Sequence, residues 1–112
     1  MSDGLPSGML VTALVRRAND AGGLGVVRAK GDPQAGAILV VVADRGAPPK
    51  VLERGIGPDG RTALIDATPR DADAAAIELY WHRRRERDRD LWVVELDIPS
   101  AERFAAETML GR

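Results

Sequence analysis

Arginine side chains are concentrated between Tyr80 and Glu95, sixteen positions that also hold the only histidine and three of the four aromatic residues. Guanidinium groups beside aromatic rings bind carboxylates and phosphates with favourable geometry. On a helix, Arg83, Arg84 and Arg87 lie within about 100° of one another and form one cationic face. We therefore predict a binding site for a protein partner or a small anionic ligand at these three residues.

Acidic residues in the same segment limit its attraction for polyanions. Residues 82–90 hold five arginines and three acids, a formal sum of +2, whereas surfaces that follow a phosphate backbone carry few acids. The four aromatic residues of the chain give no stacking platform for single strands, so nucleic acid is not a predicted partner. In the competing interpretation the segment is a solvated helix end, with Trp81 and Trp92 in the core and Arg85 and Arg89 in solvent.

Carboxylates offer a second chemistry, which is magnesium-dependent hydrolysis. An order of helix, three strands, helix and strand is shared with the core of restriction-endonuclease-like nucleases, where an acid and a Glu-x-Lys pair hold the metal. Here Asp32 or Asp44 would be the first acid and Glu53 the second, but Arg54 and Gly55 follow Glu53 and the lysine is missing. The competing interpretation places these acids in turns and near a sheet edge.

Other catalytic chemistry finds little support in the residues. The chain has no cysteine, which excludes disulfides, thiolate nucleophiles and cysteine-ligated metals. His82 is the only imidazole, and no serine or threonine has the strand-turn-helix setting of a nucleophile elbow. We predict no catalytic residue and no cofactor, so the expected protein is a non-catalytic domain.

The segment Gly55–Gly60 has the spelling of the dinucleotide-binding motif G-x-G-x-x-G. In that motif the third glycine opens a helix, whereas Gly60 is followed by a strand-like run. Pro58-Asp59-Gly60 is typical of a turn between two strands. The segment is therefore predicted to be a hairpin.

Length and composition indicate one domain. The 112 residues are 45% hydrophobic and carry a net charge of −1, which suits a single core over residues 1–112, with residues 1–7 expected to be flexible. The longest apolar runs, 9–15 and 37–43, are too short to span a bilayer. With no export signal at its start, the chain is expected to be cytoplasmic, without a membrane partner.

The hydrophobic pattern predicts an α/β (α+β) domain with a mixed five-stranded sheet flanked by helices, in the order α-β-β-β-β-α-β-α. Continuous apolar character places the run 37–43 in the middle of the sheet, covered on both faces. Ser7 is the expected N-cap of the first helix. The expected helices are 9–21, 69–87 and a last one opened by Pro99 and Ser100, and the expected strands are 24–29, 37–43, 50–54, 62–67 and 91–96.

The segment Thr68-Pro69-Arg70-Asp71 is typical of a helix start. It has an N-cap hydroxyl at Thr68, a proline at the first helical position and an acid three residues after the cap. The apolar stripe of the second helix ends where the arginines begin, so its far end is expected to project beyond the sheet. The helix is expected to connect two strands of the sheet as a crossover.

Two segments of the chain resemble a family of short, uncharacterised bacterial proteins, mainly alphaproteobacterial, classed as a domain of unknown function. They are Gly31-Asp32-Pro33-Gln34-Ala35-Gly36-Ala37, before an apolar strand, and Arg83–Arg85, followed by Asp88–Glu95. The family pattern has an aromatic residue and then Asp-Pro-Asp where this chain has Arg87-Asp88-Arg89-Asp90. The resemblance implies one domain over nearly the whole chain and brings no activity, cofactor or site with it.

Three functions therefore remain open at the level of sequence. The first is a cytoplasmic binding domain that uses Arg83, Arg84 and Arg87. The second is a divergent magnesium-dependent nuclease. The third is an assembly subunit that associates, with a partner or with itself, through an exposed sheet edge.

Overall fold

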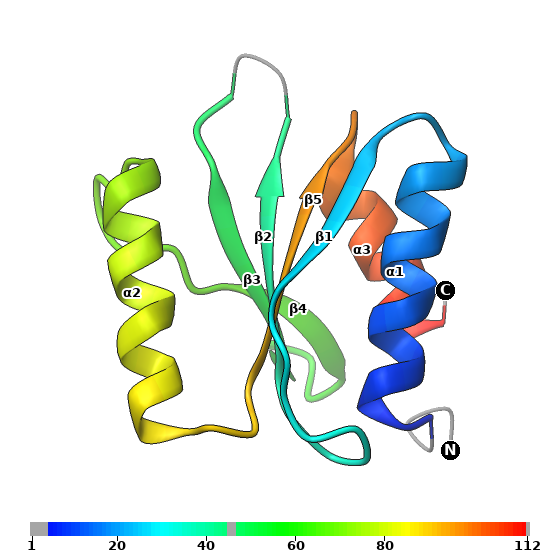
Figure 1. Ribbon diagram of the computed structural model, residues 1–112, viewed down its shortest axis with the longest axis horizontal. Coiled ribbons are helices and arrows are strands. Elements are labelled where there is room, and N and C mark those ends of the chain that lie inside the picture. The colour runs from blue at the N-terminus through cyan, green and yellow to red at the C-terminus, as the bar shows by residue number, and fades with distance from the viewer. Residues whose placement is uncertain (1–4, 45–46, 112) are drawn as a thin grey trace.

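Eight elements follow one another in the order predicted from the sequence (Figure 1). The computed structural model describes residues 5–44 and 47–111. The flexible start predicted for residues 1–7 falls partly on residues 1–4, which lie outside the described residues. The elements are α1 (Ser7–Asp20), β1 (Leu24–Ala29), β2 (Ile38–Ala43), β3 (Lys50–Ile56), β4 (Thr62–Asp66), α2 (Ala74–Arg87), β5 (Trp92–Asp97) and α3 (Ala101–Leu110).

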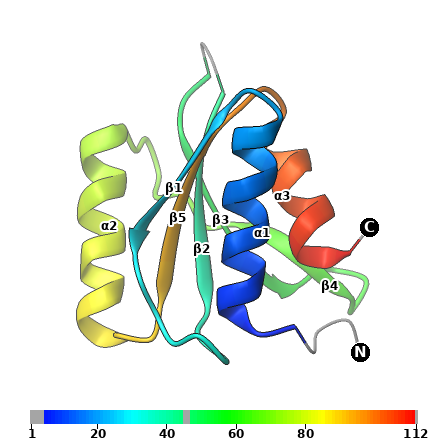
Figure 2. The same cartoon turned by 45° about the vertical axis from the view of Figure 1, so that its right-hand side comes forward.

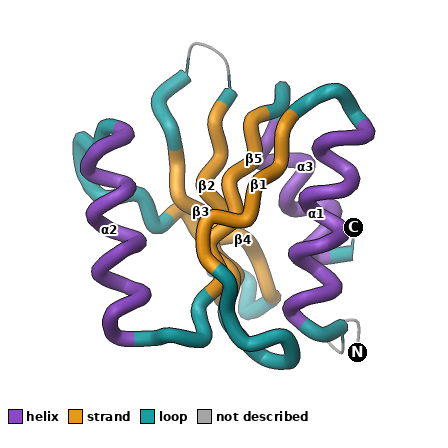
Figure 3. The backbone as a smooth tube through the Cα atoms, in the orientation of Figure 1, coloured by secondary structure: helices purple, strands orange, loops and turns teal. Residues whose placement is uncertain are grey.

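The five strands form one mixed sheet in the order β1-β5-β2-β3-β4 (Figure 3). β2 and β5 are parallel, and the other neighbours are antiparallel. β4 and β5 consequently run in the same direction, and α2 carries the chain between them as a crossover. The helices α1 and α3 cover one face of the sheet and α2 covers the other (Figures 1 and 2).

The central position predicted for the apolar run 37–43 is confirmed, because β2 lies in the middle of the sheet with hydrophobic side chains on both faces. Val40 and Val42 belong to the cluster under α1 and α3. Leu39 and Val41 belong to the cluster under α2. Alternation along a strand sends successive side chains to opposite faces, so an uninterrupted apolar run is what a doubly covered strand requires.

The two clusters differ in size. The one under α1 and α3 includes Leu10, Leu14, Ala105 and Met109 from the helices. From α2, only Ile77 and Trp81 are buried. Trp81 and Trp92 are both in the core, as predicted, but on opposite faces of the sheet.

The first helix begins at Ser7, and Pro6 occupies its N-cap position without a side-chain hydrogen bond. The prediction that Ser7 caps the helix is wrong. The Ser7 hydroxyl is buried and donates to the carbonyl oxygen of Gly36 at 2.6 Å. Because the hydroxyl is bonded to Gly36, which is distant in sequence, it does not cap the helix.

The second helix begins at Ala74, five residues after the predicted start at Pro69. Asp71 has a φ of 54°, which interrupts any helix from Pro69 onward. The actual cap is Asp73, whose carboxylate accepts from the amide of Ala76 at 2.9 Å. Thr68 serves the sheet instead, since its hydroxyl oxygen accepts from the amide of Val51 at 2.9 Å.

The glycine-rich segment between β3 and β4 is a hairpin, as predicted. The amide of Gly57 donates to the carbonyl oxygen of Arg61 at 2.8 Å, and Gly60 has a φ of 80°. That left-handed conformation is one that glycine adopts without strain. A dinucleotide-binding turn would lead into a helix, so that interpretation fails here.

The loop of residues 31–36 binds the start of β5 through the backbone of Asp90. The carbonyl oxygen of Asp90 accepts from the amide of Asp32 at 3.0 Å. A Cβ on either Gly31 or Gly36 would lie 2.1 Å from that same oxygen. The indole Nε1 of Trp92 then donates to the carbonyl oxygen of Asp32 at 2.8 Å. The loop thereby connects the starts of α1, β2 and β5.

Replacing Gly31 or Gly36 with alanine is expected to lower the free energy of unfolding by about 2–4 kcal/mol. The added methyl group overlaps the Asp90 oxygen and displaces it from the amide of Asp32. Urea denaturation measures the loss. Gly8→Ala is the matched control, because its Cβ would lie 3.4 Å or more from its neighbours and alanine favours a helix. Equal stability of all three variants would contradict this account.

Candidate functional site

The arginine face predicted from the sequence lies on the C-terminal half of α2, and the structure divides it. Arg83 and Arg87 are exposed, and within the described part of the chain neither side chain has a hydrogen bond or an ion pair. Arg84 is partly buried, with 30% of its side chain exposed, and is bonded to the sheet. Two of the three predicted residues are therefore available to a ligand.

Arg84 connects α2 to β3 through a bidentate ion pair with Glu53. Its Nη1 and Nη2 lie 2.8 and 3.2 Å from the two carboxylate oxygens. The guanidinium also donates to the hydroxyl of Tyr80 at 2.9 Å and lies over its ring. The hydrogen bond to Glu53 raises the pKa of Arg84, against the opposing effect of burial. Arg84 thus has a structural role that its helical position alone does not reveal.

Arg85 was predicted to lie in solvent, and that prediction is wrong. Its Nη1 donates to the carbonyl oxygens of Lys30, Arg89 and Leu91 at 3.0, 2.6 and 3.0 Å. Lys30 directly follows β1, whereas Arg89 and Leu91 lie between α2 and β5. The arginine therefore holds the join between α2 and β5 against the end of β1. Arg89 itself is exposed, as predicted.

A polar network surrounds Trp81 on the α2 face of the sheet. Its Nε1 donates to Glu78 at 3.0 Å, and Arg28 of β1 forms ion pairs with Glu78 and Glu95 at 3.0 and 2.7 Å. The hydrogen bond to Glu95 is the main cause of the raised pKa of Arg28. Arg28 was not singled out from the sequence, although a lone cation within the strand Leu24–Ala29 was a signal.

His82 stacks on the ring of Trp81, with 3.8 Å between the ring centroids, and faces solvent. Within the described residues it meets no hydroxyl nucleophile through a hydrogen bond. The stacking gives this histidine a packing role at the edge of the core.

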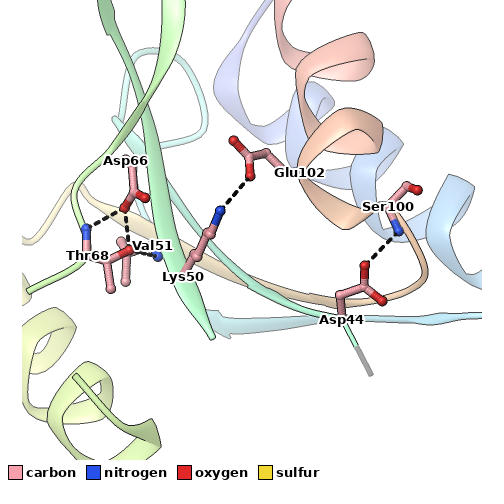
Figure 4. Close-up of polar contacts among 7 residues, drawn as sticks. All are labelled: Asp44, Lys50, Val51, Asp66, Thr68, Ser100 and Glu102. Carbon is pink, nitrogen blue, oxygen red and sulfur yellow. Dashed lines mark hydrogen bonds and ion pairs between the residues drawn. The ribbon is translucent and has the colours of Figure 1, made fainter. Parts of the chain in front are cut away.

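The three acids of the nuclease interpretation do not meet. The carboxylate of Asp32 accepts from the amides of Gln34 and Ala35 within its own loop. Asp44 accepts from the amide of Ser100 at the start of α3 (Figure 4), and Glu53 is bonded to Arg84. Among residues 5–44 and 47–111, no group of three or more potential ligands is placed to hold a metal.

A cleft of about 620 Å³ lies between β3, β4 and the start of α3. Lys50 pairs with Glu102 at 3.2 Å, and the carboxylate of Asp44 accepts from the amide of Ser100 (Figure 4). Arg103, on the same rim, lies 3.6 Å from Glu107. Both cations of the cleft, Lys50 and Arg103, are therefore already paired with acids.

The edges of the sheet are β1 and β4. β1 exposes Leu24, Val26 and Val27, but its ladder is interrupted after Val27 and the amide of Gly25 is bonded to the side chain of Asn19. Interrupted or occupied edges pair poorly with another strand. Assembly through a sheet edge remains a prediction from the sequence.

The sequence pattern of a protein family of unknown function, DUF1491, matches residues 5–106. The chain belongs to this family. The resemblance found in the sequence is thereby confirmed. A search of curated proteins gives no match.

Solved structures of the family have the same fold. A crystal structure of a DUF1491 protein from Caulobacter crescentus CB15 is 31% identical, with a TM-score of 0.77, covering 89% of this chain and 94% of that one. An NMR structure from the same organism is 30% identical, with a TM-score of 0.75 and coverages of 90% and 92%. Protein Atu0922 from A. tumefaciens is 28% identical, with a TM-score of 0.71 and coverages of 87% and 88%.

Both segments that carry the family resemblance are structural in this DUF1491 protein. The loop 31–36 receives the carbonyl oxygen of Asp90 and the indole of Trp92. Arg84 and Arg85 bind the sheet and the join before β5. The join between α2 and β5 is held by Arg85 and by the carboxylate of Asp88, which accepts from the amide of Asp90.

A double-mutant cycle on Arg84 and Glu53, with each residue changed to alanine, is expected to give a coupling free energy of about 1 kcal/mol. The two-pronged pair is partly shielded from water. The exposed pair of Lys50 and Glu102 is the control, with an expected coupling below about 0.5 kcal/mol. Denaturation of the four variants of each pair provides the measurement. Equal couplings for the two pairs would show that Arg84 does not fasten α2.

Asp66 provides a pH-dependent contribution to stability. Hydrogen bonds from the hydroxyl and then the amide of Thr68 lower the pKa of Asp66 (Figure 4). Because the folded pKa lies below the unfolded one, the contribution is complete above about pH 4 and is lost as the pH falls through the folded pKa.

The Asp66→Asn variant keeps an acceptor for Thr68 but cannot ionise. We expect it to be less stable than the wild type at pH 7, and we expect the gap to be smaller at about pH 3, because a larger fraction of Asp66 is protonated there. Urea denaturation at both values tests this. A gap that stays constant between the two pH values would rule out the linkage.

Proposed function

We propose that this DUF1491 protein is a non-catalytic binding domain that recognises an acidic segment of a protein partner through Arg83 and Arg87. The observation that carries the proposal is that both arginines are exposed and, within the described residues, unpaired. They are four residues apart on α2, so they project from the same side of the helix. Two guanidinium groups on one side suit two carboxylates of a partner.

The neighbouring arginines favour this function by holding the helix still. Arg84 bonds α2 to β3. Arg85 bonds the last turn of α2 to the backbone of Lys30 and of Leu91. A binding face that is already ordered loses less conformational entropy when a partner binds. Arg83 and Arg87 are therefore presented on a fixed backbone.

A protein carboxylate suits the site better than a nucleic acid does. Glu86, Asp88 and Asp90 are exposed close to the two free arginines. These acids repel a continuous phosphate backbone, whereas separate carboxylates can approach each guanidinium individually. A small anionic ligand is an alternative outcome of the test described below.

The proposed setting of this binding is the cytoplasm, as predicted from the sequence. No helix within the described residues is long and apolar enough to cross a membrane.

Changing Arg83 and Arg87 together to alanine is expected to abolish the capture of the partner from a lysate of the native cell. Arg61→Ala with Arg70→Ala is the matched control, because both residues are exposed and the loss of charge is the same. The captured protein is identified by mass spectrometry, purified and titrated. Binding should weaken by at least about tenfold in the Arg83 and Arg87 variant and should weaken with added salt.

A partner held equally by the wild type and by the Arg83 and Arg87 variant would contradict the proposal. Loss of binding in the control variant as well would indicate a general effect of net charge. Transfer of the salt-dependent binding to a small anion would identify the alternative ligand.

A further inference from the structure

A second cleft, of about 610 Å³, lies between α1 and β1, on the opposite face of the sheet from α2. Figure 2 shows the two elements side by side. Its walls are mainly apolar, formed by Val11, Val15, Val27 and Trp92. The volume falls within the range of about 300–1,000 Å³ that is usual for small-molecule sites, which are also largely apolar with a few polar groups.

The charged groups of this cleft differ from those of the other clefts. Arg16 and Lys30 line it, together with Asp20. Within the described residues, none of these three side chains has a hydrogen bond or an ion pair. In the cleft beside α3 the cations Lys50 and Arg103 are paired with acids, and in the one under α2 Arg28 is paired with Glu78 and Glu95. Only the cleft beside α1 combines apolar walls with unmatched cations among these three.

We propose that this cleft binds an amphipathic monocarboxylate. The hydrocarbon part of the ligand packs on the valines and Trp92, and its carboxylate interacts with Arg16 or Lys30. Two cations and one acid leave a single excess positive charge, which one carboxylate neutralises. A dianionic phosphate would instead remain undercompensated beside Asp20 and would leave the apolar walls unused.

Trp92 makes the proposal directly measurable. It lines this cleft, whereas Trp81 lies on the other face of the sheet. In the Trp81→Phe variant, the fluorescence therefore reports only on Trp92. We expect decanoate, added below its aggregation concentration, to change this fluorescence saturably. Decylammonium has the same chain with the opposite charge, and it should bind at least about fivefold more weakly.

Substitution of the cations separates the charged part of the site from the apolar part. Arg16→Gln and Lys30→Gln, in the Trp81→Phe background, should each weaken decanoate binding by about two- to fivefold. Neutral decanol should bind these variants and the parent equally. Arg61→Gln with Arg70→Gln is the control for net charge and should leave decanoate binding unchanged.

Chemical shifts of the backbone amides locate the ligand independently. Decanoate should shift the signals of Val11, Val15 and Val27 and leave those of Ile77 and Val51, on the α2 face, unchanged. No saturable response to decanoate, equal binding of decylammonium or shifts confined to the α2 face would each overturn the proposal. None of these readouts depends on Arg83 or Arg87, so the two binding proposals stand or fall separately.

Discussion

The fold depends on one close approach between backbones, in which the carbonyl oxygen of Asp90 lies against both Gly31 and Gly36. No side chain fits at either glycine, because a Cβ would come within 2.1 Å of the oxygen. The contact fixes where the chain enters β5, which must insert between β1 and β2. The contact thereby positions the join between α2 and β5 against the loop that leads into β2.

The second consequence concerns α2, which is attached mainly through polar contacts. Only Ile77 and Trp81 are buried on this helix, and such a small apolar contact leaves a helix free to shift. Ion pairs to Glu53 and Arg28 and the hydrogen bonds of Arg85 supply the remaining restraint. In the arginine-rich segment, Arg84 and Arg85 therefore hold α2 on the sheet, whereas Arg83 and Arg87 are exposed to solvent.

The match to the DUF1491 family covers residues 5–106 and so includes both the loop 31–36 and α2. The two segments on which the resemblance was based are the glycine loop and the arginine segment before β5, and in this chain both maintain the fold. Binding chemistry must then be sought in side chains that the framework leaves unpaired. Arg83 and Arg87 on one face, and Arg16 and Lys30 on the other, are such side chains within the described residues.

The number, type and order of the elements, the central position of β2 and the hairpin after β3 could all be predicted from the sequence, because each depends on local periodicity or on turn residues. The sequence did not determine the starts of α1 and α2, since Ser7 and Thr68 hydrogen-bond to segments distant in sequence. Only the tertiary structure decided which arginines are free. Helical spacing places Arg83, Arg84 and Arg87 on one face, but it cannot show that Glu53 lies opposite Arg84, because that meeting depends on how α2 packs on the sheet.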